Sequence, residues 1–295
     1  MSYKKIITFI TLLIFVNSGH AAKLKVGVTL QPYYSWVKNI VQDRAEVIPL
    51  IESGNNVHAY VPRPADIERA MGLDVLVVNG VGHDEFAFKI LEAAALDKKK
   101  MPLIYANEGV ALTPVGGSSG KGQINSHTFV SISVSIQQIY KISEKLGEMD
   151  KKNAQFYRTN AGAYAKRLRK MKAGFMKQLA DVDELNLKCA TIHGGYDYLL
   201  QEFGVQVIAV VEPSHGVAPT ASQMAETIEK LKKLKVNVVF TEMNFGPKYI
   251  GVIAKETGAK VKKLSHLTSG KYTAENFENG MRKNMEVVVD AILGK

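Results

Sequence analysis

The chain has 295 residues, of which 46% are hydrophobic and 22% are charged, and its formal net charge is +10. This composition is typical of a globular protein and excludes collagen-like and low-complexity chains. Cys189 is the single cysteine, which excludes an intrachain disulfide framework. The lysines are spread over helical stretches without interleaved aromatic residues, so we expect no nucleic-acid partner in spite of the basic charge.

Residues 1–22 have the pattern of a secretory signal peptide. Lys4 and Lys5 precede the apolar run 6–16, and small residues lead to a cleavage site near residues 21–22. This run is shorter than the ~20 residues that a transmembrane helix needs, and no cysteine follows it that would carry a lipid anchor. We therefore predict that the leader is cleaved and that the mature protein is free in the periplasm. An uncleaved anchor is the alternative.

The first half of the chain alternates predicted strands and helices. Strand-like runs at 24–30, 46–51, 74–79 and 102–105 are separated by helical patterns at 33–42, 65–71 and 86–96. Nearly continuous apolar strands separated by helices predict a parallel sheet with helices on both faces. Residues 113–123 are rich in glycine and serine and predict a surface loop. The loop ends at residues 123–127, and a helix is expected to open at His127 and to run to about Gly147.

The longest helical signal lies in the middle of the chain. Apolar side chains recur at steps of three and four from Tyr157 to Leu179, which predicts one helix over about 151–180, roughly 45 Å long at ~1.5 Å per residue. The second half then repeats the alternation, with strands at 187–192, 206–211, 236–242 and 259–264 and helices at 195–203, 221–234, 247–257 and 274–292.

These patterns predict an α/β protein of two (β/α)4-type lobes with parallel sheets, joined by a single long backbone helix. The N-terminal lobe is expected at 23–150, the linking helix at 151–182 and the C-terminal lobe at 183–295. No internal sequence repeat indicates that one lobe is a duplicate of the other.

Four histidines follow predicted strands or lie in loops that can reach the same edge of a lobe: His58, His127, His193 and His266. Open α/β sheets bind ligands beyond the carboxyl ends of their strands. If the lobes face each other, two histidines from each lobe can converge in the cleft. Four neutral imidazoles suit zinc better than magnesium or manganese. The plainer alternative is that each of these histidines is simply a solvated loop residue.

The segments around these histidines resemble the solute-binding receptors of bacterial zinc and manganese ABC importers. Residues 58–66 match their His-x-Tyr-x-Pro-x-Pro-x-Asp motif, and 125–127 resemble an Asn-Pro-His motif with serine in place of proline. Residues 192–199 are similar to the third histidine element of that family. The resemblance extends over nearly all of the mature chain and includes 74–80, 240–245 and 256–261.

The resemblance implies two lobes joined by one long helix, a divalent metal ion held between the lobes, and a cognate ABC permease in the inner membrane as partner. Carried over residue by residue, the family's first three ligands fall on His58, His127 and His193. We expect the receptor to be a monomer.

The family's fourth ligand is usually an aspartate shortly after the last strand, and this chain departs from that pattern. It has Ser265 and His266 there, and we expect His266 to replace the aspartate. The alignment with the family also allows Ser265 to correspond to the aspartate. Water or a carboxylate such as Glu242 would then be the fourth ligand of the metal ion. Zinc-preferring members often carry a histidine-rich loop, but 116–122 contain no histidine, so we expect no metal-collecting role there.

Other polar and aromatic residues are less strongly indicated as parts of the metal site. His83 is either a ligand, a supporting group or a surface loop residue, and His215 is expected in an exposed loop. Glu242 ends a strand and would either orient a ligand imidazole or make a structural hydrogen bond. Tyr60 and Trp36 are placed to close over the site, although core packing is the simpler role for Trp36.

Three functions fit these features. The first is a receptor, not an enzyme, that captures zinc, or less favourably manganese, outside the cytoplasm and delivers it to an ABC importer. The second is an exported zinc-dependent hydrolase with three histidine ligands, an open water position and Glu242 or Glu85 as base, but no helix-borne His-Glu-x-x-His signature supports it. The third is an exported receptor for an organic solute, or an adhesin, whose binding a chelator would not affect.

Overall fold

The computed structural model describes residues 22–53, 55, 57, 60–97, 99–117, 124–212, 217–243 and 248–295. The predicted signal peptide lies outside the described residues except for its last position, as do His58, His215 and most of the glycine- and serine-rich loop. In the part of the chain that the structure describes, no helix combines the length and the apolar character needed to cross a membrane.

The first lobe contains a four-stranded parallel sheet in the order β2-β1-β3-β4. Its strands are β1 (Leu24–Val28), β2 (Ala45–Pro49), β3 (Val75–Val78) and β4 (Leu103–Tyr105). The central strand β3 has the sequence VLVV and is buried along its whole length, which is the pattern expected of a strand covered on both faces.

The second lobe repeats this arrangement with a parallel sheet in the order β6-β5-β7-β8. Its strands are β5 (Cys189–Thr191), β6 (Val207–Val210), β7 (Val238–Glu242) and β8 (Lys260–Leu264). His193 comes two residues after β5, Glu242 ends β7, and His266 comes two residues after β8. The carboxyl ends of three neighbouring strands therefore bring these side chains to one edge of the sheet.

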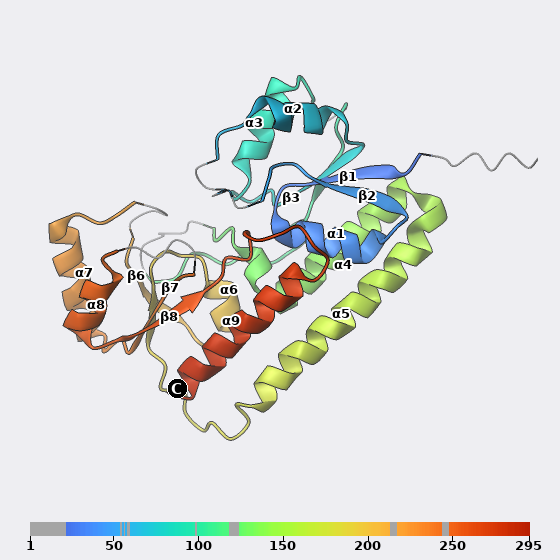
Figure 1. The fold of residues 1–295 in the computed structure, drawn as a ribbon. Coiled ribbons are helices and arrows are strands. Elements are labelled where there is room, and N and C mark those ends of the chain that lie inside the picture. The colour runs from blue at the N-terminus through green and yellow to red at the C-terminus, as the bar shows by residue number, and fades with distance from the viewer. Residues whose placement is uncertain are drawn as a thin grey trace, which may run out of the picture.

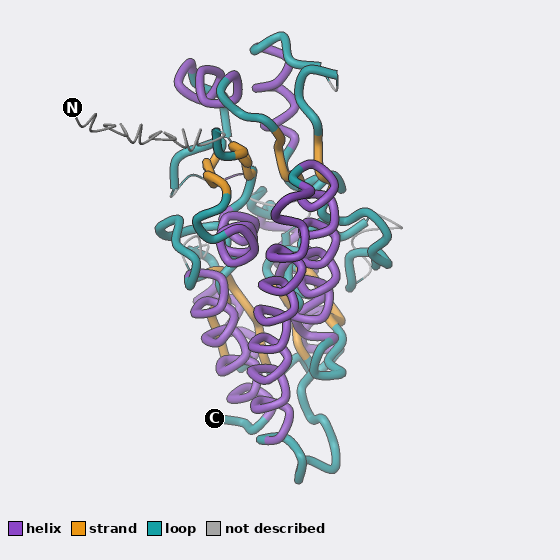
Figure 2. Tube along the Cα trace, turned by 90° about the vertical axis from the view of Figure 1, so that its right-hand side faces the viewer, coloured by secondary structure: helices purple, strands orange, loops and turns teal. Residues whose placement is uncertain are grey.

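Helices cover both sheets and join the lobes on one side of the molecule (Figure 1). They are α1 (Gln31–Val41), α2 (Pro64–Met71), α3 (Glu85–Ala93), α4 (Ile132–Met149), α5 (Ala154–Lys177), α6 (Asp197–Gln201), α7 (Ala221–Lys233), α8 (Ile250–Thr257) and α9 (Asn276–Ile292). Figure 2 shows the long helices side by side along the length of the molecule. The predicted fold class, two parallel α/β lobes with one long connecting helix, is confirmed.

The connecting helix α5 is shorter than the predicted 151–180. It has 24 residues and is therefore about 36 Å long at ~1.5 Å per residue. A 3₁₀ turn at Lys151–Asn153 precedes it, and the chain turns at Gln178 after it. The predicted apolar stripe is confirmed, because Tyr157, Ala161, Tyr164, Leu168, Met171 and Phe175 are all buried.

The segment before α9 crosses back onto the first lobe. The Ser35 hydroxyl donates a hydrogen bond to the carbonyl of Thr273 at 2.7 Å, and the Asn39 amide donates to that of Ala274 at 2.8 Å. Trp36 is fully buried, and its ring lies edge-on to Phe277 with centroids 5.1 Å apart. The core-packing interpretation of Trp36 is confirmed. These contacts hold the lobes together on the helical side and so fix the spacing across the cleft.

A second interlobe contact lies near the predicted site. Glu202, which follows α6, accepts hydrogen bonds from the backbone N–H and the hydroxyl of Ser133 at 2.7 and 3.0 Å. Its carboxylate also contacts the Ser131 hydroxyl and the Lys172 ammonium group. Only 3% of this side chain is exposed. Ser131 caps α4, so a buried carboxylate of the second lobe holds the start of the helix that follows His127.

Candidate metal centre

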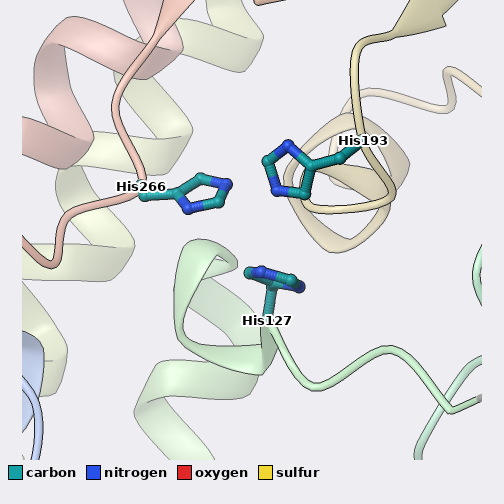
Figure 3. Close-up of side chains that lie close together, drawn as sticks. All are labelled: His127, His193 and His266. Carbon is teal, nitrogen blue, oxygen red and sulfur yellow. The ribbon is translucent and has the colours of Figure 1, made fainter. Parts of the chain in front are cut away.

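Three imidazoles from three separate segments meet between the lobes. His127 directly precedes the 3₁₀ helix Thr128–Val130 in the first lobe, while His193 and His266 follow β5 and β8 in the second. One ring nitrogen of each histidine lies within 4.8 Å of the corresponding nitrogens of the other two. Figure 3 shows the three rings turned toward a common space. The spacing is small enough for one cation to contact all three rings after small side-chain adjustments.

These rings are shielded from solvent. His127 and His193 are 7% and 3% exposed, and the side chain of His266 is 10% exposed. The ring centroids of His193 and His266 are 4.4 Å apart, and those of His127 and His266 are 4.9 Å apart. Neutral imidazoles in such a dry site have strong lone-pair donors and little water to compete with them, which favours binding of a metal ion.

Asn125 fixes the orientation of His127. The Asn125 side-chain oxygen accepts a hydrogen bond from the backbone N–H of His127 at 2.9 Å and lies 3.0 Å from its Nδ1. A neutral imidazole that donates through Nδ1 keeps its lone pair on Nε2. In the tautomer that donates from Nδ1 to this oxygen, His127 would keep its Nε2 lone pair for a metal ion.

Glu242 lies beside the other two histidines. Its Oε1 is 2.8 Å from Nδ1 of His193 and 3.9 Å from Nε2 of His266, and the residue is 6% exposed. A carboxylate in contact with a ligand imidazole orients the ring and increases its basicity. The negative charge of Glu242 also favours a cation in the adjacent space.

Tyr196 forms a wall of the site. Its ring centroid is 5.8 Å from that of His193 and 5.1 Å from that of His266, and its hydroxyl donates a hydrogen bond to the carbonyl of Leu264 at 3.1 Å. Burial, with a smaller contribution from the charge of Glu242, raises the pKa of Tyr196 well above its ordinary value. The hydroxyl therefore stays protonated and serves as a hydrogen-bond donor to the chain that carries His266.

Gly195 makes room for the rings of His193 and His266. A Cβ atom at position 195 would lie 2.4 Å from Nε2 of His193 and 2.7 Å from Nε2 of His266, both closer than real Cβ contacts allow. A Cβ atom at Gly194 would meet Val115 of the first lobe at 2.2 Å. This requirement was not predicted from the sequence, although two consecutive glycines directly after a strand-end histidine indicate a close approach of neighbouring atoms.

The contacts of Ser265 and His266 show which of the two residues lies in the histidine group. The Ser265 hydroxyl accepts a hydrogen bond from the backbone N–H of Leu267 at 3.0 Å, and the Ser265 backbone bonds to the Asn284 side chain. Ser265 thus forms the turn that presents the next residue. It is His266 that joins the histidine group.

His83 is near the group without belonging to it. Its ring centroid is 4.7 Å from that of His127 and 4.9 Å from that of Phe129, and it is 2% exposed. The surface-loop interpretation of His83 is therefore wrong. Among the described residues, the group of converging ligand atoms contains His127, His193 and His266 and does not include His83.

His58 lies outside the described residues, but the remainder of its motif is well anchored. The Tyr60 hydroxyl donates a hydrogen bond to Oδ2 of Asp66 at 2.6 Å, and the backbone N–H of Arg63 donates to the same oxygen at 2.9 Å. Asp66 is 1% exposed and lies in the first turn of α2, which begins at Pro64. Burial and the bond to Asp66 raise the pKa of Tyr60 to about 12. The tyrosine and aspartate of the motif therefore attach the chain after His58 to α2.

Comparison with known proteins places the chain in a family. Residues 26–291 match the family model ZnuA, described as "Zinc-uptake complex component A periplasmic". The zinc-binding lipoprotein AdcA of Streptococcus pneumoniae (strain ATCC BAA-255 / R6) is 25% identical over 281 residues, which cover 90% of this chain and 55% of AdcA. This chain thus spans about half the length of that relative. The iron-binding protein YfeA of Yersinia pestis is 27% identical over 243 residues, covering 82% of this chain and 77% of YfeA.

Solved structures agree with this assignment. The SBP FpvC from Pseudomonas aeruginosa in complex with Mn2+ is 48% identical with a TM-score of 0.87, covering 92% of this chain and 99% of that one. A structure of FpvC in complex with Ni2+ ion is 47% identical with a TM-score of 0.86, covering 92% and 97%. The chain therefore belongs to the ZnuA family, whose model matches residues 26–291.

Proposed function

We propose that this protein is a receptor that binds zinc outside the cytoplasm and delivers it to an ABC-type permease in the inner membrane. The observation that carries the proposal is the convergence of His127, His193 and His266, three imidazoles from both lobes with ligand atoms within 4.8 Å of one another. The names of the relatives support a metal as cargo, because AdcA is called zinc-binding and YfeA iron-binding. A cleaved signal peptide, a periplasmic location and a monomeric state belong to the same proposal.

The proposed ligand set is His58, His127, His193 and His266. The anchored motif after His58 supports its inclusion, because Tyr60 and Asp66 fix the chain two residues beyond it. An all-imidazole set favours zinc over manganese, which prefers carboxylate, carbonyl and water oxygens. FpvC has been crystallised with Mn2+ and with Ni2+, so competition between metals is the decisive property to measure.

The hydrolase alternative gains no support from the site. A catalytic zinc site needs an open position for water and a base directed at it. Glu242, one of the two carboxylates considered for that role, instead contacts the Nδ1 of His193 at 2.8 Å. The likeness to the ZnuA family and to the SBP FpvC supports a binding role. Four imidazoles in a closed shell fit the storage and transfer of an ion.

Metal titration tests this function directly. The mature protein, stripped of metal with a chelator and carrying no histidine tag, is expected to take up one zinc ion per chain at submicromolar free zinc. In an equimolar mixture of zinc and manganese, we expect zinc to occupy the site, as read by elemental analysis after gel filtration. No uptake at micromolar metal would end the receptor proposal. Preferential uptake of manganese would end the zinc assignment alone.

Zinc affinity is expected to fall as the pH is lowered through about 6.5–6, because imidazole binds metal only in its neutral form and protons compete for the same nitrogens. With three or four imidazoles involved, the loss should exceed tenfold per pH unit at pH 5–6. Chelator competition at pH 7.5, 6.5 and 5.5 measures the effect, with thermal unfolding at each pH as a control for folding. An affinity that is constant over this range would show that imidazoles do not hold the ion.

A further inference from the structure

Asp197 of the second lobe accepts hydrogen bonds from two donors on the segment that leads to His127. Its Oδ2 accepts from the side-chain amide of Asn125 at 2.8 Å, and its Oδ1 accepts from the backbone N–H of Gly116 at 3.0 Å. Asp197 is 4% exposed and is the first residue of α6. Burial raises the pKa of Asp197, and the hydrogen bonds from Gly116 and Asn125 oppose this shift because they favour the ionised carboxylate, which is an acceptor only.

Asn125 connects this carboxylate to the candidate ligand His127. An asparagine side chain has an oxygen on one side and an NH₂ group on the other, and only its hydrogen-bond partners determine which way it faces. Asp197 can only accept, so the NH₂ group of Asn125 must face Asp197. The oxygen of Asn125 then faces His127 and accepts from its backbone N–H at 2.9 Å, a bond that favours the same orientation, while Nδ1 of His127 lies 3.0 Å from this oxygen.

The orientation of the Asn125 amide also determines which ring nitrogen of His127 carries the proton. Opposite an amide oxygen, a neutral imidazole carries its proton on Nδ1 and its lone pair on Nε2. If the amide of Asn125 were turned around, its NH₂ group would face Nδ1, and the proton of His127 would move to Nε2. Nε2 could then no longer bind a metal ion without losing that proton.

We propose that Asp197 is a positioning residue for metal binding: acting from the second lobe through Asn125, it holds His127 with its proton on Nδ1 and Nε2 presented to the ion. The inference rests on the proposed function, and it adds a residue that does not touch the metal. The proposal also connects the two lobes. Asp197 lies four residues after His193 in the second lobe, whereas Asn125 and His127 belong to the first, so a residue of one lobe would set the tautomer of a ligand in the other.

Asparagine at position 197 cannot replace the aspartate. Its side chain offers one acceptor and one NH₂ group to two donors. Either the Gly116 N–H loses its acceptor, or Asn125 loses the acceptor of its NH₂ group and is oriented by the backbone N–H of His127 alone. Loss of a group that orients a metal ligand typically costs 10–100-fold in affinity. For Asp197→Asn, we therefore expect the zinc Kd to rise by about 10–100-fold.

Two control variants separate this role from a general loss of stability. Asp150 also accepts from two donors, Asn153 and Tyr157, both at 2.7 Å. It lies between α4 and α5, so Asp150→Asn repeats the same chemical change away from the histidines. Tyr198→Phe removes the hydroxyl that bonds to the Asn125 carbonyl and to the Thr113 N–H at 3.2 and 2.9 Å. This change loosens the same segment without altering the contact that orients the Asn125 side chain.

The experiment compares the wild type with these three variants in two measurements. Zinc Kd is obtained by chelator competition, and the ring-nitrogen NMR shifts of the metal-free protein at pH 8 give the tautomer of each histidine, with His127 assigned from a His127→Gln spectrum. The wild type should show His127 protonated on Nδ1. Asp197→Asn should lower both the fraction of His127 protonated on Nδ1 and the zinc affinity, while Asp150→Asn and Tyr198→Phe should keep the tautomer and bind within about threefold of wild type.

Three results would overturn the inference. They are an Nε2-protonated His127 in the wild type, a Kd for Asp197→Asn within twofold of wild type, and an equal loss of affinity in Asp150→Asn. The wild-type spectrum gives an answer even if a variant does not fold. Failure of the wild type to bind zinc would instead contradict the proposed function, so the two failures are distinguishable.

Discussion

Replacement of His193 by alanine is expected to weaken zinc binding about a hundredfold. Structural zinc sites with four ligands have apparent binding free energies of ~10–16 kcal/mol, so an average ligand accounts for about 3 kcal/mol, or roughly two orders of magnitude in Kd. His193 is one of three converging imidazoles, and its loss also leaves Glu242 facing an enlarged space in place of the ring it now contacts at 2.8 Å. Competition with a chromophoric chelator at pH 7.5 measures the change.

His83→Ala is the matched control for this variant. Its ring is also buried and contacts His127, but among the described residues it does not belong to the converging group. We expect His83→Ala to raise the zinc Kd by less than tenfold, since it removes packing rather than a donor atom. A His193→Ala protein that binds zinc within threefold of wild type would remove His193 from the ligand set. Equal losses in both variants would assign His83 to that set.

Gly195→Ala is expected to weaken zinc binding by about 10–100-fold although it removes no ligand. The added methyl carbon would lie 2.4 Å from Nε2 of His193 and 2.7 Å from Nε2 of His266, well inside van der Waals contact. One or both rings must move away, and losses of this order are typical when a ligand is misoriented. Isothermal titration with zinc measures both the affinity and the stoichiometry, which should remain one ion per chain.

Gly174→Ala provides the control for this glycine substitution. Gly174 lies in α5, and a Cβ atom there would meet nothing within 4 Å. We expect this variant to bind zinc as the wild type does and to unfold at a slightly higher temperature, because alanine favours a helix over glycine by ~0.5–1 kcal/mol. Wild-type affinity in Gly195→Ala would show that His193 and His266 do not direct their Nε2 atoms to a common ion beside Gly195.

The fold was largely predictable because its strands are short apolar runs between helical patterns. All eight predicted strands are present with boundaries within about two residues, as the buried VLVV of β3 illustrates. The ends of helices were less predictable. The helix expected directly after His127 begins with a 3₁₀ turn and restarts at Ile132, because Ser131 caps α4 and bonds to Glu202 of the other lobe. Such a tertiary contact leaves no local pattern in the sequence.

The convergence of the candidate histidines was predictable where they follow strand ends, whereas features that depend on packing were missed. His193 and His266 are at strand ends in the sequence, and the structure brings them together with His127. Asp197 and Gly195 were not identified, because their roles depend on atoms from distant segments: the Asn125 amide in one case and the His266 ring in the other. The surface alternative for His83 is wrong because the rings of His127 and Phe129 pack against it, which the sequence does not show.

The most direct test of the central claim is a crystal structure of the zinc-loaded protein with anomalous data collected on both sides of the zinc absorption edge. We predict a single anomalous peak between the lobes, with ring nitrogens of His127, His193 and His266 at about 2.0–2.1 Å from the ion. A zinc ion bound elsewhere, or an ion that contacts the histidines of one lobe alone, would contradict the account.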